Sequence, residues 1–165
     1  MNQTNVKYKF FYGGVLSNFH RTRIVDENGH EFFCSEQKFM YDKAMTFKDE
    51  EVALKILEIT DDPSECKKYG RQVKDFDQKV WDEVKYDIMY RANYLKYSQS
   101  ENLLEYLASL HEYELVEASP YDRIWGIGYN SYDAMNNIPN WGQNLLGKIL
   151  TDLSNKFYSD LKSKG

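Results

Sequence analysis

The stretch SEQKFMYDKAMTF, residues 35–47, carries the clearest structural signal in the chain. Its apolar side chains recur at the three- and four-residue spacing of an amphipathic α-helix, and they are Phe39, Met40, Ala44 and Phe47. Ser35 precedes them as a candidate N-cap, because a serine hydroxyl can accept a hydrogen bond from a backbone N–H of the first turn. The pattern predicts a helix from Ser35 to about Phe47.

The segments before this helix predict extended structure. Residues 23–26 and 31–34 flank the run ENGH (27–30), and an Asn-Gly pair between two extended segments is a strong hairpin signal. Further upstream, the aromatic run KYKFFY (7–12) ends at two glycines, as a strand does when it enters a turn. We therefore expect a strand followed by an antiparallel hairpin.

The segments after this helix are mostly helical. The predicted helices begin at Asp49, at Asp62 (ending at Gly70), at Asp77 (to about Tyr97), at Ser100 and at about Gln143 (to Leu161). The first four of these starting residues have side chains that can cap a helix. One further run, Glu114–Ala118, favours a strand. Together these elements predict the α+β class, a mostly helical domain with a small antiparallel sheet.

Length and composition limit the possible classes of protein. The chain has 165 residues and a mass of 19.6 kDa, which is typical of one domain, so we expect a single domain over residues 1–165 with its core at about 10–160. The net charge of −5 excludes the general positive excess of proteins that bind nucleic acid without regard to sequence. A local basic cleft remains open. The 14 tyrosines favour an aromatic pocket that also offers hydrogen bonds.

Several common features are missing from the sequence. The only cysteines, Cys34 and Cys66, form no CxxC or Cys/His grouping, which favours a reducing compartment. The start has no apolar stretch typical of a signal peptide, and no apolar run of 18 residues occurs, so we expect a cytoplasmic protein with no membrane partner. The three histidines are scattered, and no HExxH, P-loop or GxSxG motif occurs, so we expect no metal site.

Two glutamates are candidates for chemistry. Glu36 lies in the first turn of its predicted helix, and Lys43 follows on the same face two turns later. The alternative is a dipole partner and a solvated lysine. Glu117 shares a face with Leu115 by the two-residue period of a strand, so its carboxylate could point as a core leucine does. The alternative is a residue at the end of an edge strand.

The segment from Ser119 to Asn140 is predicted to be a long loop, ordered by its aromatic residues and functional because of its length. Asp122 precedes Trp125 by three residues, and in such a turn an aspartate often caps the local backbone. Trp125 stands beside Gly126, where a flat ligand could approach the indole. Asn144 lies at the head of the last helix, where free N–H groups could hold a phosphate.

Several blocks follow one another in a fixed order along the chain. They are FYGG and LSNFH within residues 11–20, SEQKFMYDKA (35–44), YGRQV (69–73), Trp81, LVEASPYDRIWGIG (115–128) and NLLG (144–147). From about Phe10 to Leu153 this set resembles the NADAR superfamily, the YbiA-like N-glycosidases. The resemblance implies a mostly helical α+β fold and hydrolysis of the bond between ribose and a nitrogen leaving group.

The resemblance also implies substrates. They are phosphoribosylamino-pyrimidine intermediates of riboflavin synthesis, or ADP-ribosylated guanine, either free or within DNA or RNA. No cofactor and no metal are implied, and the oligomeric state stays open. A non-catalytic module that binds ADP-ribose or a nucleotide is the alternative, because it would use the same rings and cations.

By position, the resemblance implies a catalytic set of Glu36, Lys43, Glu117 and Asp122, and a binding set of Asn18, Arg71, Trp81, Trp125, Gly126 and Asn144. Glu36 and Asp122 would share water activation and cation stabilisation. Trp125 and Trp81 would stack on the base, and Lys43 and Arg71 would meet phosphate or ribose oxygens. One departure is Ile127, which stands where some members carry an acidic residue, so no role can rest on a carboxylate there.

Overall fold

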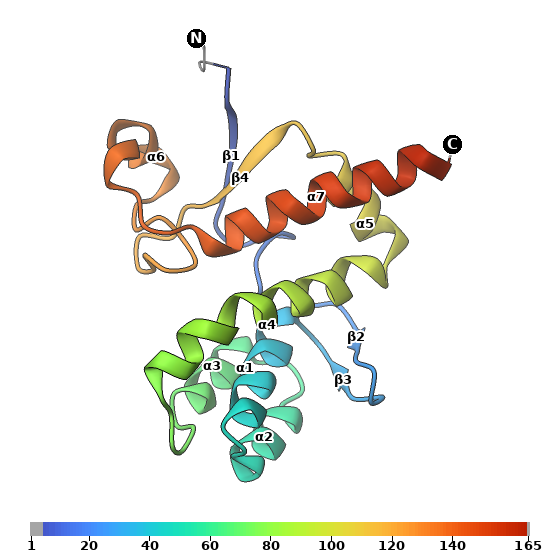
Figure 1. Ribbon diagram of the computed structural model, residues 1–165, viewed down its shortest axis with the longest axis vertical. Coiled ribbons are helices and arrows are strands. Elements are labelled where there is room, and N and C mark those ends of the chain that lie inside the picture. The colour runs from blue at the N-terminus through green and yellow to red at the C-terminus, as the bar shows by residue number, and fades with distance from the viewer. Residues whose placement is uncertain (1–4, 165) are drawn as a thin grey trace. The chain divides into compact units, whose positions relative to one another are not determined.

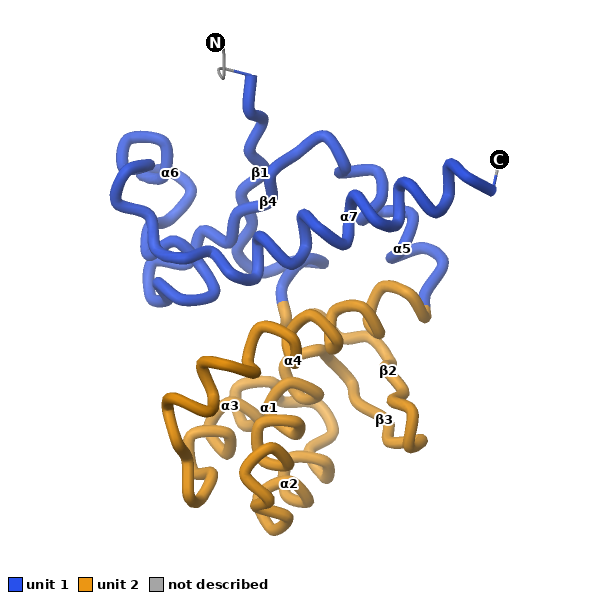
Figure 2. Tube along the Cα trace, viewed as in Figure 1, with its two compact units in different colours: residues 1–17, 100–165 blue, residues 18–99 orange. Residues whose placement is uncertain are grey.

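The computed structural model describes residues 5–164. The chain divides into two compact units (Figure 2): unit 1 comprises residues 1–17 and 100–165, and unit 2 comprises residues 18–99. Helices dominate the described part of both units, and each contains a two-stranded sheet (Figure 1), which confirms the expected α+β class. None of the helices in the described residues is long and apolar enough to cross a membrane.

Helix α1 (Ser35–Thr46) is the central element of unit 2. It packs against the three other helices of the unit, which are α2 (Glu50–Leu57), α3 (Pro63–Gly70) and α4 (Gln78–Ser98), as can be followed in Figure 1. Its apolar side chains Phe39, Met40 and Ala44 are buried, as the spacing predicts. The stretch SEQKFMYDKAMTF therefore lies at the core of this unit.

The first turn of α1 is buried although its side chains are polar. The helix begins at Ser35 and its N-cap is Cys34, so the predicted Ser35 cap is wrong. The Ser35 hydroxyl instead donates to Oδ1 of Asn18 at 2.8 Å. The backbone N–H of Glu36 donates to the carbonyl oxygen of Asn18 at 3.0 Å, so a neighbouring loop satisfies this helix end.

Gln37 ties α1 to two other segments. Its amide nitrogen donates to the carbonyl oxygens of Ile56 and Ile59, each at 2.9 Å, and its amide oxygen accepts the N–H of Phe33 at 2.8 Å. These bonds join α1 to the end of α2 and to the hairpin.

The predicted hairpin is confirmed but short. Strands β2 (Ile24–Val25) and β3 (Glu31–Phe32) pair antiparallel. The Asp26 carboxylate accepts two backbone N–H groups of the turn at 2.9 Å, and it lies 3.7 Å from the buried ammonium of Lys38 on α1. One carboxylate therefore shapes the turn and holds the hairpin against the central helix.

The four predicted helix caps downstream are confirmed. In each case the side chain accepts a hydrogen bond from an N–H of the first turn, and the residues are Asp49, Asp62, Asp77 and Ser100. Ser100 opens α5 (Glu101–Ala108) in unit 1. Caps of this kind depend only on neighbouring residues, so the sequence alone locates them.

Unit 1 is built around a parallel strand pair. Strands β1 (Lys7–Phe11) and β4 (Tyr113–Glu117) run parallel, with Phe11 opposite Glu117. Helix α7 (Leu145–Lys164) packs against β4 and α5. The parallel pairing was not expected, because the two strands are far apart in the sequence and no turn between them signals it.

The expected loop at residues 119–140 is wrong for its second half. That half forms helix α6 (Ser131–Ala134) and the 3₁₀ helix η1 (Met135–Asn140). The indole N–H of Trp141 donates to the carbonyl of Ala134 at 2.9 Å, and its ring packs against two aromatic rings of β1. Packing on a distant strand thus orders a segment whose composition is typical of a loop.

Helix α4 buries a lysine and leaves a valine exposed. Val80 is 40% exposed, whereas Lys96 is fully buried. Burial lowers the pKa of Lys96 to about 7, and the nearby Cys34 thiol only partly opposes this effect. Burial also raises the pKa of the Cys34 thiol to about 11 and that of the Cys66 thiol to about 12.

We expect Gly147→Ala to destabilise the fold. A Cβ at Gly147 would collide with the carbonyl oxygen of Leu115 and with the side chain of Asn144. The free energy of unfolding should therefore fall by about 3 kcal/mol, although alanine is the better helix former. Lys148→Ala, at the next and exposed position, is the control and should change it by less than about 0.5 kcal/mol. Equal denaturant midpoints for the two variants would contradict the close approach of α7 to β4.

We expect the stability of the protein to rise with pH above about 7. Lys96 is largely neutral there in the folded state, whereas in the unfolded chain it keeps its proton up to about its ordinary pKa of 10.5. The unfolded state thus binds the extra proton, and the free energy of unfolding should rise by up to about 1.4 kcal/mol per pH unit.

Urea unfolding between about pH 7 and pH 8 measures this slope, mostly below the range in which unfolded thiols ionise. Lys96→Met should lose the slope. A variant that keeps the full wild-type slope would rule out Lys96 as its source.

Candidate functional site

The expected site residues fall into two groups, one in each unit. Unit 2 contains Asn18, Glu36, Lys43, Arg71 and Trp81, and unit 1 contains Glu117, Asp122, Trp125, Gly126 and Asn144.

Lys43 interacts electrostatically with two other charged side chains of unit 2. Glu36, in the first turn of α1, is 7% exposed, and Lys43, in the last turn, is half-buried. Partial burial lowers the pKa of Lys43, the Glu36 carboxylate raises it, and the Arg71 guanidinium at the C-cap of α3 lowers it further. The charges of Glu36 and Arg71 are therefore within electrostatic range of the Lys43 ammonium. A fully solvated lysine, the alternative left open by the sequence, does not fit.

Lys43 lies over two aromatic rings. Its Nζ is 4.9 Å from the ring centre of Phe76 and 5.6 Å from that of Trp81. Trp81 is only 7% exposed, and its ring centre lies 5.4 Å from that of Phe39 and 6.5 Å from that of Phe47. Little of the indole is accessible for stacking on a base. Trp81 instead makes a cation–π contact with the Lys43 ammonium.

Asn18 directs its side chain into the protein. Its Oδ1 accepts hydrogen bonds from the Ser35 hydroxyl at 2.8 Å and from the Asn93 amide at 3.3 Å, and its Nδ2 lies 3.4 Å from the sulfur of Met89. Its carbonyl oxygen accepts the N–H of Glu36. Through these contacts Asn18 holds the backbone at the start of α1, including Glu36, in place.

Asn144 plays a comparable part in unit 1. Its backbone φ of 51° is left-handed, a conformation that asparagine tolerates better than most residues. Its Oδ1 accepts the N–H of Glu117 at 2.9 Å, and its Nδ2 donates to the carbonyl of Leu115 at 3.1 Å. The side-chain amide thus bonds to β4 as a neighbouring strand would, and it holds Glu117 in place.

Gly126 lies directly against Glu117. A Cβ at this position would come within 2.8 Å of the backbone oxygen of Glu117 and 3.3 Å of its Oε2. Glu117 stands at the end of β4, which is the alternative that the sequence left open, and it is half-buried whereas Leu115 is fully buried. The absence of a side chain at Gly126 lets the loop run beside this carboxylate.

Asp122 caps the turn that carries Trp125. Its Oδ1 accepts the N–H groups of Ile124 and Trp125, each at 2.9 Å, which is the local capping role that the sequence left open. The carbonyl of Trp125 accepts the N–H of Leu146 at 3.1 Å. The side chain of Trp125 is half-buried. The backbone of Trp125 is therefore fixed from two sides.

Most N–H groups at the start of α7 are already bonded, so the expectation that they are free to hold a phosphate is wrong. Its N–H groups and those just before it donate to the carbonyls of residues 123–127 at 2.7–3.1 Å, and the donors are Gly142, Gln143, Asn144, Leu145 and Leu146. These five donors are bonded to the preceding loop and are not available to a phosphate.

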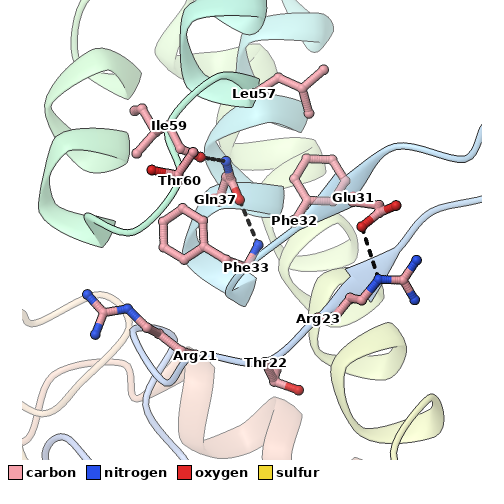
Figure 3. Close-up of a pocket in the computed structure, with 10 residues that line it drawn as sticks. All are labelled: Arg21, Thr22, Arg23, Glu31, Phe32, Phe33, Gln37, Leu57, Ile59 and Thr60. Atoms are coloured by element: carbon pink, nitrogen blue, oxygen red, sulfur yellow. Dashed lines mark hydrogen bonds and ion pairs between the residues drawn. The ribbon is translucent and has the colours of Figure 1, made fainter.

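A pocket of about 520 Å³ lies elsewhere in unit 2, between the hairpin and the end of α2 (Figure 3). Its two arginines, Arg21 and Arg23, point away from each other, and Arg23 pairs with Glu31 at 3.0 Å. The inward amide of Gln37 is occupied by three hydrogen bonds. The pocket thus lacks convergent polar groups for a ligand. Within residues 5–164, no three His, Cys, Asp or Glu side chains form a group that could hold a metal.

Neither the position of Phe76 beside Lys43 nor the burial of Lys96 was predicted from the sequence. Phe76 precedes the N-cap Asp77, and Trp81 is the fourth residue of α4. These are the two positions of a hydrophobic staple, so the spacing was a usable signal. No comparable signal exists for Lys96, because a buried lysine and a solvated one look alike in a helical sequence.

Similarity to known proteins covers nearly the whole chain. The NADAR domain model matches residues 6–158. The chain is 39% identical over 160 residues to N-glycosidase R617 of Acanthamoeba polyphaga mimivirus, covering 87% of this chain and 92% of that protein. It is 37% identical over 153 residues to Protein irg-1 of Caenorhabditis elegans, covering 90% and 72%.

Two further matches extend the comparison. Riboflavin biosynthesis protein PYRR of Zea mays is 34% identical over 151 residues, which are 85% of this chain but only 23% of that protein. The NMR structure of Escherichia coli YbiA superposes with a TM-score of 0.78 at 25% identity, covering 99% of this chain and 91% of that one. The resemblance noted from the sequence motifs is confirmed, and the chain belongs to the NADAR domain family.

Proposed function

We propose that this protein is an N-glycosidase that hydrolyses the bond between ribose and a nitrogen leaving group. The observation that carries the proposal is the buried carboxylate of Glu36 in a region shared with the cations of Lys43 and Arg71. The 39% identity to a protein named N-glycosidase supports the same reaction class. The family match runs through both units, which supports treating residues 1–165 as one NADAR domain.

The reaction makes two demands that a carboxylate can meet. Breaking a ribosyl C–N bond develops positive charge at the anomeric carbon, and water must then attack that carbon. A carboxylate can stabilise the charge or accept a proton from the water. We assign one of these tasks to Glu36, and the family resemblance assigns the other to Asp122, with Glu117 as a further acidic candidate.

The cations and rings have separate tasks in this proposal. Lys43 and Arg71 bind phosphate or ribose oxygens, for which a guanidinium and an ammonium are suitable donors. Lys43 can also give a hydrogen bond or proton to the departing nitrogen, and its lowered pKa favours proton donation. Trp125 stacks on the base, whereas Asn18 and Asn144 act by holding the segments that carry Glu36 and Glu117.

Two substrate classes are the leading candidates. Similarity to the maize riboflavin biosynthesis protein, of which this chain spans about a quarter, supports a phosphoribosylamino-pyrimidine. The resemblance to the NADAR superfamily adds ADP-ribosylated guanine, free or in DNA or RNA. Because Cys34 and Cys66 are both free thiols, we place the activity in the reducing cytoplasm.

Incubation with both substrate classes, followed by mass spectrometry of the released fragments, tests the proposal. Release of a free base from either class supports it. Binding without release would instead support the non-catalytic ADP-ribose- or nucleotide-binding module. Absence of both binding and release would contradict both functions.

We expect Glu36→Gln to lower the turnover rate by about 10²–10⁴, the usual contribution of a placed acid or base. The amide keeps the shape of the side chain but loses its charge and its ability to accept a proton. Glu50→Gln is the matched control, because Glu50 also lies in the first turn of a helix but is exposed. Single-turnover rates and thermal melting of both variants make the measurement.

Glu50→Gln should keep the wild-type rate. A wild-type rate in Glu36→Gln would remove Glu36 from the mechanism. Parallel losses of rate and melting temperature in that variant would show that Glu36 serves only the helix.

Two substitutions at Asp122 separate its capping role from chemistry. Asp122→Asn keeps an oxygen for the N–H groups of Ile124 and Trp125, so stability and ligand affinity should hold while the chemical rate falls. Asp122→Ala also loses the cap and should cost about 1 kcal/mol of stability. A wild-type rate in Asp122→Asn would confine Asp122 to capping.

A further inference from the structure

Phe76 is the accessible aromatic ring beside Lys43. It is 40% exposed, whereas the other ring beneath that ammonium, Trp81, is 7% exposed. The ring centre of Phe76 lies 5.2 Å from that of Phe47 at an interplanar angle of 54°. Phe47 and the Lys43 ammonium each cover part of the ring, and the remaining part is open to solvent.

The loop that carries Phe76 is held on both sides of the ring. Before it, Val73 is buried, and the N–H of Lys74 donates to the carboxylate of Asp49 at 2.8 Å. After it, the side chain of Asp77 caps α4. A large exposed ring on an anchored loop is preorganised for a flat partner, because little conformational freedom is lost when the partner binds.

We propose that Phe76 is a specificity-determining residue whose exposed ring stacks on the planar base of the substrate beside Lys43. The inference rests on the proposed function and adds to it a residue that recognises the base. Ribosides whose leaving group is an aromatic nitrogen base are favoured over those with a non-aromatic amine. Stacking on an aromatic side chain is largely indifferent to which base is present, so Phe76 selects for aromaticity and not for a particular base.

A purely structural role for Phe76 makes different demands. As the partner of Trp81 in a hydrophobic staple, Phe76 would need only an apolar side chain, and leucine would serve. As a support for the Lys43 ammonium, it would affect every anionic ligand equally, with or without a base. Stacking requires a ring and affects only ligands that carry a base.

Binding of GMP and of ribose 5-phosphate, measured by calorimetry, distinguishes these roles, because the two ligands differ by the base alone. Phe76→Ala and Phe76→Leu should each weaken GMP binding by about tenfold, which corresponds to about 1.4 kcal/mol, and leave ribose 5-phosphate within about twofold. Phe76→Trp should retain GMP affinity. Val80→Ala, at a position that is also 40% exposed on the same stretch of chain, is the control and should change neither.

Full GMP affinity in Phe76→Leu, or equal losses for both ligands in Phe76→Ala, would overturn the inference. If the wild type releases a base from the substrate panel and the Phe76 variants bind GMP normally, only this inference fails. If the wild type binds neither ligand and releases no base, the proposed function fails with it.

Discussion

The arrangement of unit 2 depends on the burial of the polar first turn of α1. A buried polar group without a partner costs about 1–3 kcal/mol, so each side chain there needs a partner at a defined place. Ser35 finds it in Asn18, Gln37 in the end of α2, and Lys38 in Asp26 and Asp42. Apart from Asp42, which lies on α1 itself, these partners come from three other segments, so one helical turn determines where the loop before it, the hairpin and α2 lie.

In unit 1, hydrogen bonds to backbone groups hold the segment that leads into α7 against β4 and the preceding loop. The Asn144 amide bonds to β4, and the carbonyls of residues 123–127 take up the N–H groups that lead into α7. Glycines at 126 and 147 allow these close approaches, since a Cβ at either would meet backbone oxygen. In both units an asparagine within a family motif holds the segment that carries a glutamate. Membership of a family motif therefore does not by itself show that a residue binds the substrate.

The charge distribution in unit 2 agrees with an anionic substrate. The protein as a whole carries a net charge of −5, yet two cations stand beside one carboxylate in the region of Lys43. Partial burial makes this local field stronger than the same charges would produce in water. Under the proposed function, these two cations would attract a ribose phosphate in spite of the overall charge.

The sequence by itself determined the features that depend on neighbouring residues. The caps at Asp49, Asp62, Asp77 and Ser100, the Asn-Gly hairpin, the helical periods and the family motifs all rest on interactions within a few positions, so local chemistry is enough to find them.

Only the tertiary structure decided the features that depend on distant partners. It paired β1 with β4 in parallel, turned Ser35 toward Asn18, closed the start of α7 to phosphate, covered Trp81 and left Phe76 exposed. Each of these outcomes follows from which groups meet after the chain has folded. A hydrogen-bond donor or an aromatic ring is available to a ligand only if no other part of the protein has already bound or buried it, and the local sequence does not contain that information.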